Sequence, residues 1–132
     1  MGKNGKNGKN GKPGKEDAGI ILKLAELSAL MNTQAGSELI WNPEFQADPA
    51  KHGPGTPEHT ALMQLMRWME TIGTLYRNGL INEDLLFDWL GITGTWDRVR
   101  PIALAIREHV GPAMWENFEY MAEHQRDWKP KR

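Results

Sequence analysis

The chain of 132 residues contains no cysteine, and this absence excludes several kinds of site at once. Without thiols there is no disulfide framework, no zinc site built from thiolates and no cysteine nucleophile. Long hydrophobic runs are also missing, because Lys23 and Glu26 interrupt the apolar stretch from Ala18 to Met31. A membrane-spanning helix needs about 20 predominantly apolar residues. We therefore expect a soluble, cytoplasmic protein with no membrane span.

Strand patterns are absent too, since no stretch shows the alternation or the β-branched enrichment typical of strands. Four of the eight prolines fall between residues 43 and 57, and this concentration predicts a loop there. What remains is a set of apolar residues at helical spacing. The sequence therefore predicts an all-α fold, a compact bundle of five or six helices around a long central helix.

The central helix is predicted over about residues 57–78, with Thr56 as its cap, Pro57 in its first turn and Gly79 after its end. Its apolar residues recur at steps of three and four: Leu62, Leu65, Met69, Ile72 and Tyr76. The other helices are predicted over 17–31, from Thr33 or Ser37 to Trp41, from an Asn82 cap to Leu90, from a Thr95 cap with Pro101 inside, and from Pro112 to about Arg126.

The chain opens with a repeat in which glycine stands at every third position and is followed by lysine. Residues 1–15 hold five lysines and no acid, whereas residues 16–132 hold the other 11 basic and all 17 acidic residues, a net −6. A segment of this composition cannot bury enough apolar surface to become ordered. We therefore expect residues 1–16 to be a disordered, low-complexity tail on a single helical domain of residues 17–128. Too little proline and too few triplets are present for a collagen triple helix.

Spacings typical of metal binding or catalysis do not occur. The four histidines, His52, His59, His109 and His124, form neither Glu-x-x-His nor His-x-x-x-His, so we expect no metal site and no cofactor. No nucleophile elbow or phosphate-binding loop is present, and we expect no enzyme. Two clusters of acidic residues are not interpreted as acid–base pairs. The first is interpreted as helix-capping residues: Glu83, Asp84 and Asp88. The second is interpreted as a solvated helix face: Glu116, Glu119 and Glu123.

Six tryptophans and seven methionines are many for a chain of this length. Most should fill the core, and the excess favours a non-catalytic protein-interaction module that associates with itself or with a partner helix. Its expected anchors are tryptophans off the main apolar stripes or at helix ends: Trp41, Trp68 and Trp128.

A second hypothesis assigns function to the tail. Lysines on a flexible chain bind nucleic-acid phosphates or an anionic surface through counterion release. Such binding is weak and nonspecific here, because no aromatic residue is interleaved to stack bases. The lysines concerned are Lys3, Lys6, Lys9, Lys12 and Lys15. A third hypothesis is a small-molecule or enzymatic pocket lined by His59, Arg67, Glu70 and Tyr76.

Three segments of the body resemble a known family. They are Ile20 to Leu27, the block WMETIGTLYRNGLINEDLLFDWL over residues 68–90, and Trp96 followed by RVRPI at residues 98–102. The pattern of a long helix, a turn containing NGLINEDL and a tryptophan-led helix with a proline is similar to that of small bacterial proteins of unknown function. The resemblance covers about residues 17–124. It implies an all-helical fold and supplies no activity or catalytic residues.

Overall fold

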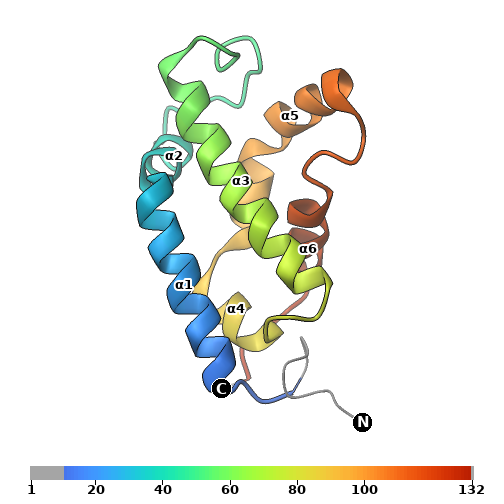
Figure 1. Ribbon diagram of the computed structural model, residues 1–132. Helices are drawn as coiled ribbons and strands as arrows, with labels where there is room; N and C mark the ends of the chain where they lie inside the picture. Colours follow the sequence, from blue (N-terminus) through green and yellow to red (C-terminus); the bar gives the residue numbers. More distant parts are fainter. Residues whose placement is uncertain (1–10, 132) are drawn as a thin grey trace.

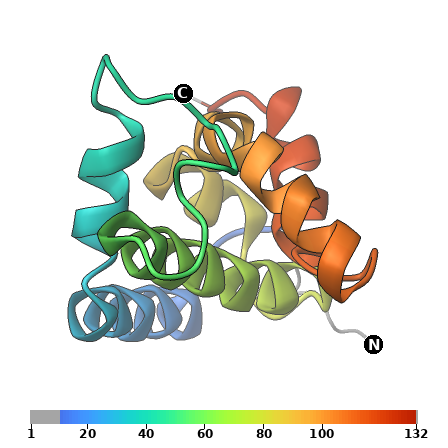
Figure 2. The same ribbon diagram turned by 90° about the horizontal axis from the view of Figure 1, so that it is seen from above.

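The computed structural model describes residues 11–131 and contains, within that range, six helices and no strand. In chain order the helices are α1 (Lys15–Met31), α2 (Thr33–Ile40), α3 (Pro57–Arg77), α4 (Glu83–Trp89), α5 (Ile92–Val110) and α6 (Glu116–Arg126). Helix α3 lies in the middle, with α1 and α2 on one side of it and α5 and α6 on the other (Figures 1 and 2). The predicted all-α bundle around a long central helix is confirmed.

The boundaries of α3 follow from residues at its two ends. Thr56 is the N-cap and Pro57 the first helical residue, where proline loses no hydrogen bond because that N–H has no partner within the helix. Beyond the other end Gly79 has a φ of +72°, a left-handed conformation that glycine adopts without steric cost. All five residues of the predicted stripe are buried: Leu62, Leu65, Met69, Ile72 and Tyr76.

Two glycines allow neighbouring helices to approach α3 closely. A Cβ atom at Gly36 of α2 would stand 2.5 Å from the carbonyl oxygen of Ala61, in α3. A Cβ at Gly73 of α3 would stand 2.5 Å from the backbone of Asn117, in α6. Neither position has room for a side chain, because both neighbours are backbone atoms that cannot rotate away.

The first helix begins two residues earlier than predicted. Gly14 is its N-cap, and the backbone N–H of Gly14 donates a 2.8 Å hydrogen bond to Oδ2 of Asp17. Asp17 therefore lies in the first turn and binds the backbone of the cap residue. Lys15 and Glu16, which we assigned to the tail, are helical, and residues 1–10 of the predicted tail lie outside the described residues.

Two further helix starts were predicted wrongly. Thr95 lies inside α5, and its hydroxyl donates to the carbonyl of Gly91, one turn earlier, at 2.9 Å. A threonine inside a helix can make this bond, so its presence does not mark a cap. Helix α6 begins at Glu116 instead of Pro112, and Trp115 before it has a φ of +66°. The buried indole of Trp115, 2% exposed, stabilises a conformation that its residue type disfavours.

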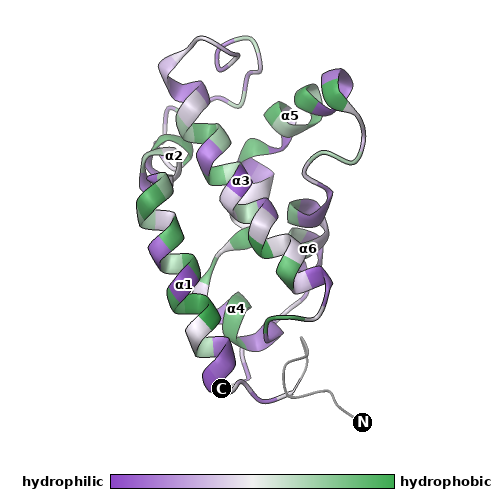
Figure 3. Cartoon of the chain, in the orientation of Figure 1, coloured by the Kyte–Doolittle hydropathy of each residue, from purple (hydrophilic) through white to green (hydrophobic). Residues whose placement is uncertain are grey.

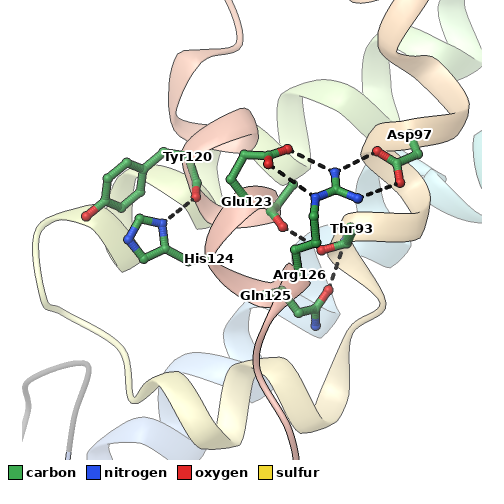
Figure 4. A network of polar contacts seen from close by, with 8 residues as sticks. Thr93, Asp97, Tyr120, Glu123, His124, Gln125 and Arg126 are labelled. Carbon is green, nitrogen blue, oxygen red and sulfur yellow. Dashed lines mark hydrogen bonds and ion pairs between the residues drawn. The ribbon is translucent and has the colours of Figure 1, made fainter.

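Two consecutive side chains of α6 join it to the end of α4 and to α5 (Figure 4). The amide of Gln125 accepts a 2.8 Å bond from the backbone N–H of Thr93 and donates to the carbonyls of Phe87 and Leu90. Arg126 makes two hydrogen bonds to Asp97, at 2.9 and 3.2 Å. The pKa of Asp97 is consequently lowered, chiefly by these bonds. These contacts fix α5, which positions the site described next.

Candidate functional site

Trp68 belongs to the core and is removed from the candidate anchors. Its side chain is 4% exposed, and Nε1 donates a 2.9 Å hydrogen bond to the carbonyl of Leu24. Its ring packs edge-to-face against the ring of Trp89, with the two ring centroids 5.9 Å apart. The prediction placed Trp68 off the main stripe, but α3 is central and buries more than one face, so an off-stripe position is not an exposed one.

Trp128 fastens the C-terminal segment to α4. Its Nε1 donates a 2.8 Å hydrogen bond to Oδ1 of Asp84, and its half-buried ring packs on Phe87 at 5.7 Å between centroids. The ammonium of Lys131 lies 3.0 Å from Oδ2 of the same carboxylate. The indole N–H, followed by the ammonium, lowers the pKa of Asp84. The indole N–H of Trp128 is thus already bonded within the protein.

Trp41 differs from the other two because 49% of its surface is exposed although its ring is held on two sides. It follows the last turn of α2, where its backbone N–H donates to Ser37. A Cβ at Gly94 of α5 would lie 3.2 Å from Cη2 of the ring. The guanidinium of Arg98, one turn further along α5, lies 4.9 Å from the ring centroid, within the range of a cation–π contact. Two helices therefore fix one exposed indole.

Trp41 stands beside a cleft of about 260 Å³, which we call the Trp41 cleft. Apart from Trp41 it is lined by Thr33, Gln34, Ser37, Leu65, Trp68, Met69, Leu90, Gly91 and Thr95. None of these side chains is charged. The cleft reaches Leu65, Trp68 and Met69, which are core residues of α3, while α2 and the α4–α5 connection form its walls. An uncharged cleft that reaches the core suits an apolar or weakly polar group of a partner.

Large apolar side chains are exposed elsewhere as well. Helix α1 is coloured as hydrophobic along much of its length (Figure 3), and Leu22 and Leu30 on it are 67% and 85% exposed. Leu80, in the turn before α4, is 51% exposed. Single exposed leucines are normal on a protein surface. Trp41 is distinguished from them by its fixed ring and by the cleft beside it.

Three residues of the predicted small-molecule pocket make contacts that hold the fold together. Glu70 of α3 accepts hydrogen bonds from the backbone N–H groups of Asn117 and Phe118 and so caps α6. The hydroxyl of Tyr76 donates to Glu83 at 2.6 Å, and burial raises the pKa of that hydroxyl. Nδ1 of His59 is bonded to the carbonyl of His52.

Three of the four histidines gather at one place, which the sequence did not reveal. His52, His59 and His109 line a cavity of about 130 Å³ between the 41–56 loop and α5. His109 is 50 positions from the nearest of the other two, so no spacing rule connects them. Across residues 11–131, no three histidine, aspartate or glutamate side chains are placed to hold one metal ion.

The described lysines of the predicted tail, Lys12 and Lys15, are exposed, whereas Lys3, Lys6 and Lys9 lie outside the described residues. The segment before α1 is attached to the body, because the side-chain amide of Asn82 donates a 2.6 Å hydrogen bond to the carbonyl of Gly11. Among the described residues no helix is long and apolar enough to cross a membrane.

Comparison with known proteins gives one match. No curated protein and no solved structure matches the chain. A family model described as a domain of unknown function, DUF4760, matches residues 15–128, a range that includes all six described helices. The resemblance to a family of unknown function is thereby confirmed, over a range slightly longer than the 17–124 expected from it. The chain belongs to the DUF4760 family.

Proposed function

We propose that the protein is a non-catalytic helical interaction module that binds a second copy of itself or a partner helix at Trp41. The observation that carries the proposal is the indole of Trp41, which is half exposed yet held between Gly94 and Arg98 beside an uncharged cleft. Tryptophan is enriched among the residues that dominate binding energies. A ring that is already fixed loses little conformational entropy when a partner binds.

The same contacts define how a partner would be recognised. The indole would pack on an apolar side chain of the partner, while a second apolar side chain would enter the Trp41 cleft toward Leu65 and Met69. Trp128 has a supporting role, because it holds the C-terminal segment against α4. We further propose that the protein is not an enzyme and works in the bacterial cytoplasm.

Two measurements on the full chain test this function, with Trp41→Ala as the variant in both. Sedimentation equilibrium measures self-association, and capture on immobilised protein detects a different partner. Because truncation of a central tryptophan typically costs about 2 kcal/mol or more, Trp41→Ala should weaken either interaction by at least roughly tenfold. The proposal is contradicted if the wild-type protein stays monomeric and also captures no partner protein that Trp41→Ala fails to capture. Leu80→Ala, at a site of similar exposure, is the control.

A second candidate function is supported by the exposure of Lys12 and Lys15. We propose that the lysine repeat, with Lys3, Lys6 and Lys9, binds nucleic-acid phosphates or an anionic surface without sequence preference. This binding would fall steeply with salt concentration. Deletion of residues 2–10, which removes three of the five lysines, should weaken this binding and lower its salt dependence, and equal binding by the intact and shortened proteins would contradict it.

A further inference from the structure

Helix α1 lies at the outside of the bundle (Figure 2), yet its outward face is largely apolar (Figure 3). A single exposed leucine is ordinary, but Leu22 and Leu30 are 67% and 85% exposed and their exposed neighbours on α1 are mostly apolar or small as well. We call the eight exposed positions between 18 and 30 the α1 face. They are Ala18, Gly19, Leu22, Lys23, Ala25, Glu26, Ala29 and Leu30.

Helix α3 shows the contrast with an ordinary exposed face. Although it lies in the middle of the bundle, the positions that it exposes are mostly polar: Pro57, Thr60, Arg67, Thr71, Thr74 and Arg77. A surface helix normally turns its polar residues outward, and a helix that is apolar all round is covered on every side. An apolar patch left on the surface of one chain marks an interaction site. We therefore expect the α1 face to be covered.

The α1 face consists of two rows that run along the helix. Steps of four, three and four separate the members of each row, which is the spacing of neighbours on one side of a helix. The first row is Ala18, Leu22, Ala25 and Ala29, and the second row is Gly19, Lys23, Glu26 and Leu30. Both rows keep their complementarity when their order is reversed.

This reversal is what a second copy of the chain provides. A two-fold axis perpendicular to α1 sets the α1 of the second copy antiparallel, so that each row meets the same row of the copy. In the first row Leu22 then meets Ala25 of the second copy. In the second row Leu30 meets Gly19 of the second copy. Each leucine is thus placed opposite a small residue, which lets the two helices approach closely.

The two charges of the α1 face pair in the same arrangement. Lys23 meets Glu26 of the second copy, and the two-fold axis makes this pairing twice. Within residues 11–131 neither side chain has an ion pair of its own. A parallel copy would instead place lysine beside lysine and glutamate beside glutamate. A lipid bilayer fits less well, because it would surround Glu26 with apolar chains and offer it no cation.

We propose that the chain forms an antiparallel homodimer through the α1 face. The inference goes beyond the function proposed at Trp41, since it assigns the second copy to α1 and leaves the Trp41 cleft to a different partner. One face of one helix is a small interface, so the dissociation constant should be in the micromolar range.

The first test is sedimentation equilibrium of the full chain between about 5 and 500 μM, with the charges reversed one at a time. Lys23→Glu and Glu26→Lys each place like charges opposite one another at two points of the dimer, and each should weaken dimerisation at least about fivefold. An equimolar mixture of these two variants should recover the wild-type affinity, because each chain then meets only opposite charges. Lys23→Glu/Glu26→Lys in one chain should recover it too.

The second test removes the apolar contacts. Leu22→Gln/Leu30→Gln should weaken dimerisation at least about a hundredfold, because four leucines of the dimer lose their apolar surface. Both positions are exposed in the single chain, so the fold does not depend on them. The matched control is Leu80→Gln, at a leucine that is 51% exposed outside the α1 face, which should dimerise like the wild type.

A wild-type protein that is monomeric over the whole range overturns the dimer, and so does a dimer that is not restored by mixing the two charge variants. If Trp41→Ala dissociates the dimer while the α1 variants do not, the second copy binds at Trp41 and only the α1 inference fails. If the α1 dimer forms but Trp41→Ala loses no captured partner, only the function proposed at Trp41 fails. A monomer that binds phosphatidylglycerol vesicles through Leu22 and Leu30 makes the α1 face a membrane surface and also overturns the dimer.

Discussion

The indole ring of Trp41 lies so close to the backbone of Gly94 that a Cβ atom there would stand 3.2 Å from Cη2. Trp41 ends α2 and Gly94 lies in the first turn of α5, so the contact joins two helices that are far apart in the sequence. With Arg98 against the same ring, it fixes an exposed aromatic group before any partner binds.

Gly94→Ala should move the ring of Trp41 without unfolding the protein. A half-exposed side chain can shift by the few tenths of an ångström that the new methyl group requires, and alanine favours the helix by up to about 1 kcal/mol relative to glycine. We expect the unfolding free energy to stay the same or rise, while the indole N–H resonance of Trp41 changes. A Trp41→Phe variant assigns that resonance in a ¹H–¹⁵N spectrum, and an unchanged resonance in Gly94→Ala would contradict the close contact.

Gly73→Ala should destabilise the protein, because its methyl group would meet the backbone of Asn117 at 2.5 Å. Helices α3 and α6 would have to separate, at a cost of about 1–3 kcal/mol typical of overpacking. The matched control is Gly19→Ala on α1, where nothing lies within 4 Å of the added atom and helix propensity predicts a gain of about 1 kcal/mol. Urea unfolding measures the free energy of unfolding of both variants. Changes of the same sign in the two would contradict the opposite effects predicted for Gly73→Ala and Gly19→Ala.

Asp17→Ala should lower the unfolding free energy by about 2–3 kcal/mol, because it leaves two backbone N–H groups without their charged acceptor. One of these belongs to Gly14 and the other to Asn82, 65 positions away. Glu26→Ala removes an exposed carboxylate from the same helix and should change stability by less than about 0.5 kcal/mol. Equal effects of the two substitutions, measured by urea unfolding, would contradict the role of Asp17.

The attachment of the C-terminal segment should fail in acid. The pKa of Asp84 is lower in the folded protein than its ordinary value of 3.8, chiefly because of the hydrogen bond from Trp128. The stability that this carboxylate contributes is therefore present above its unfolded pKa and lost as the pH falls through the lower folded pKa. The emission of Trp128, obtained as the difference between wild type and Trp128→Phe, should change below about pH 4. In Asp84→Asn the changed emission should already be present at neutral pH, and an unchanged emission there would contradict the contact.

Helices were predicted correctly where the signal for them depends on residues within a few positions of one another. Three such signals are the apolar stripe of α3, the Asn82 cap, whose side chain accepts from the N–H of Leu85, and the left-handed conformation of Gly79. The start of α5 was predicted wrongly because a threonine can cap a helix or bond one turn back inside it, and Thr95 does the second. The start of α6 was predicted wrongly because Trp115 adopts a positive φ with its indole enclosed by the core, which nothing near it in the sequence indicates.

The candidate site could be predicted only in part, for the same reason. Trp41 was identified by its place at a helix end, and the structure leaves it half exposed. Trp68 was chosen because it lies off the main stripe of α3, yet it is buried, since exposure depends on which helices surround α3. The roles of Gly94 and Arg98 are invisible in the sequence, because nothing near them indicates that α5 crosses the end of α2.

The measurement that tests the interaction function most directly is photo-crosslinking in the native cell, with a photoreactive benzoylphenylalanine in place of Trp41. The control carries the same group in place of Leu80, which is 51% exposed against 49% for Trp41. We predict a discrete adduct, with a second copy of the chain or with one partner, from position 41 and not from position 80. No adduct from position 41, or the same adducts from both positions, would contradict the account.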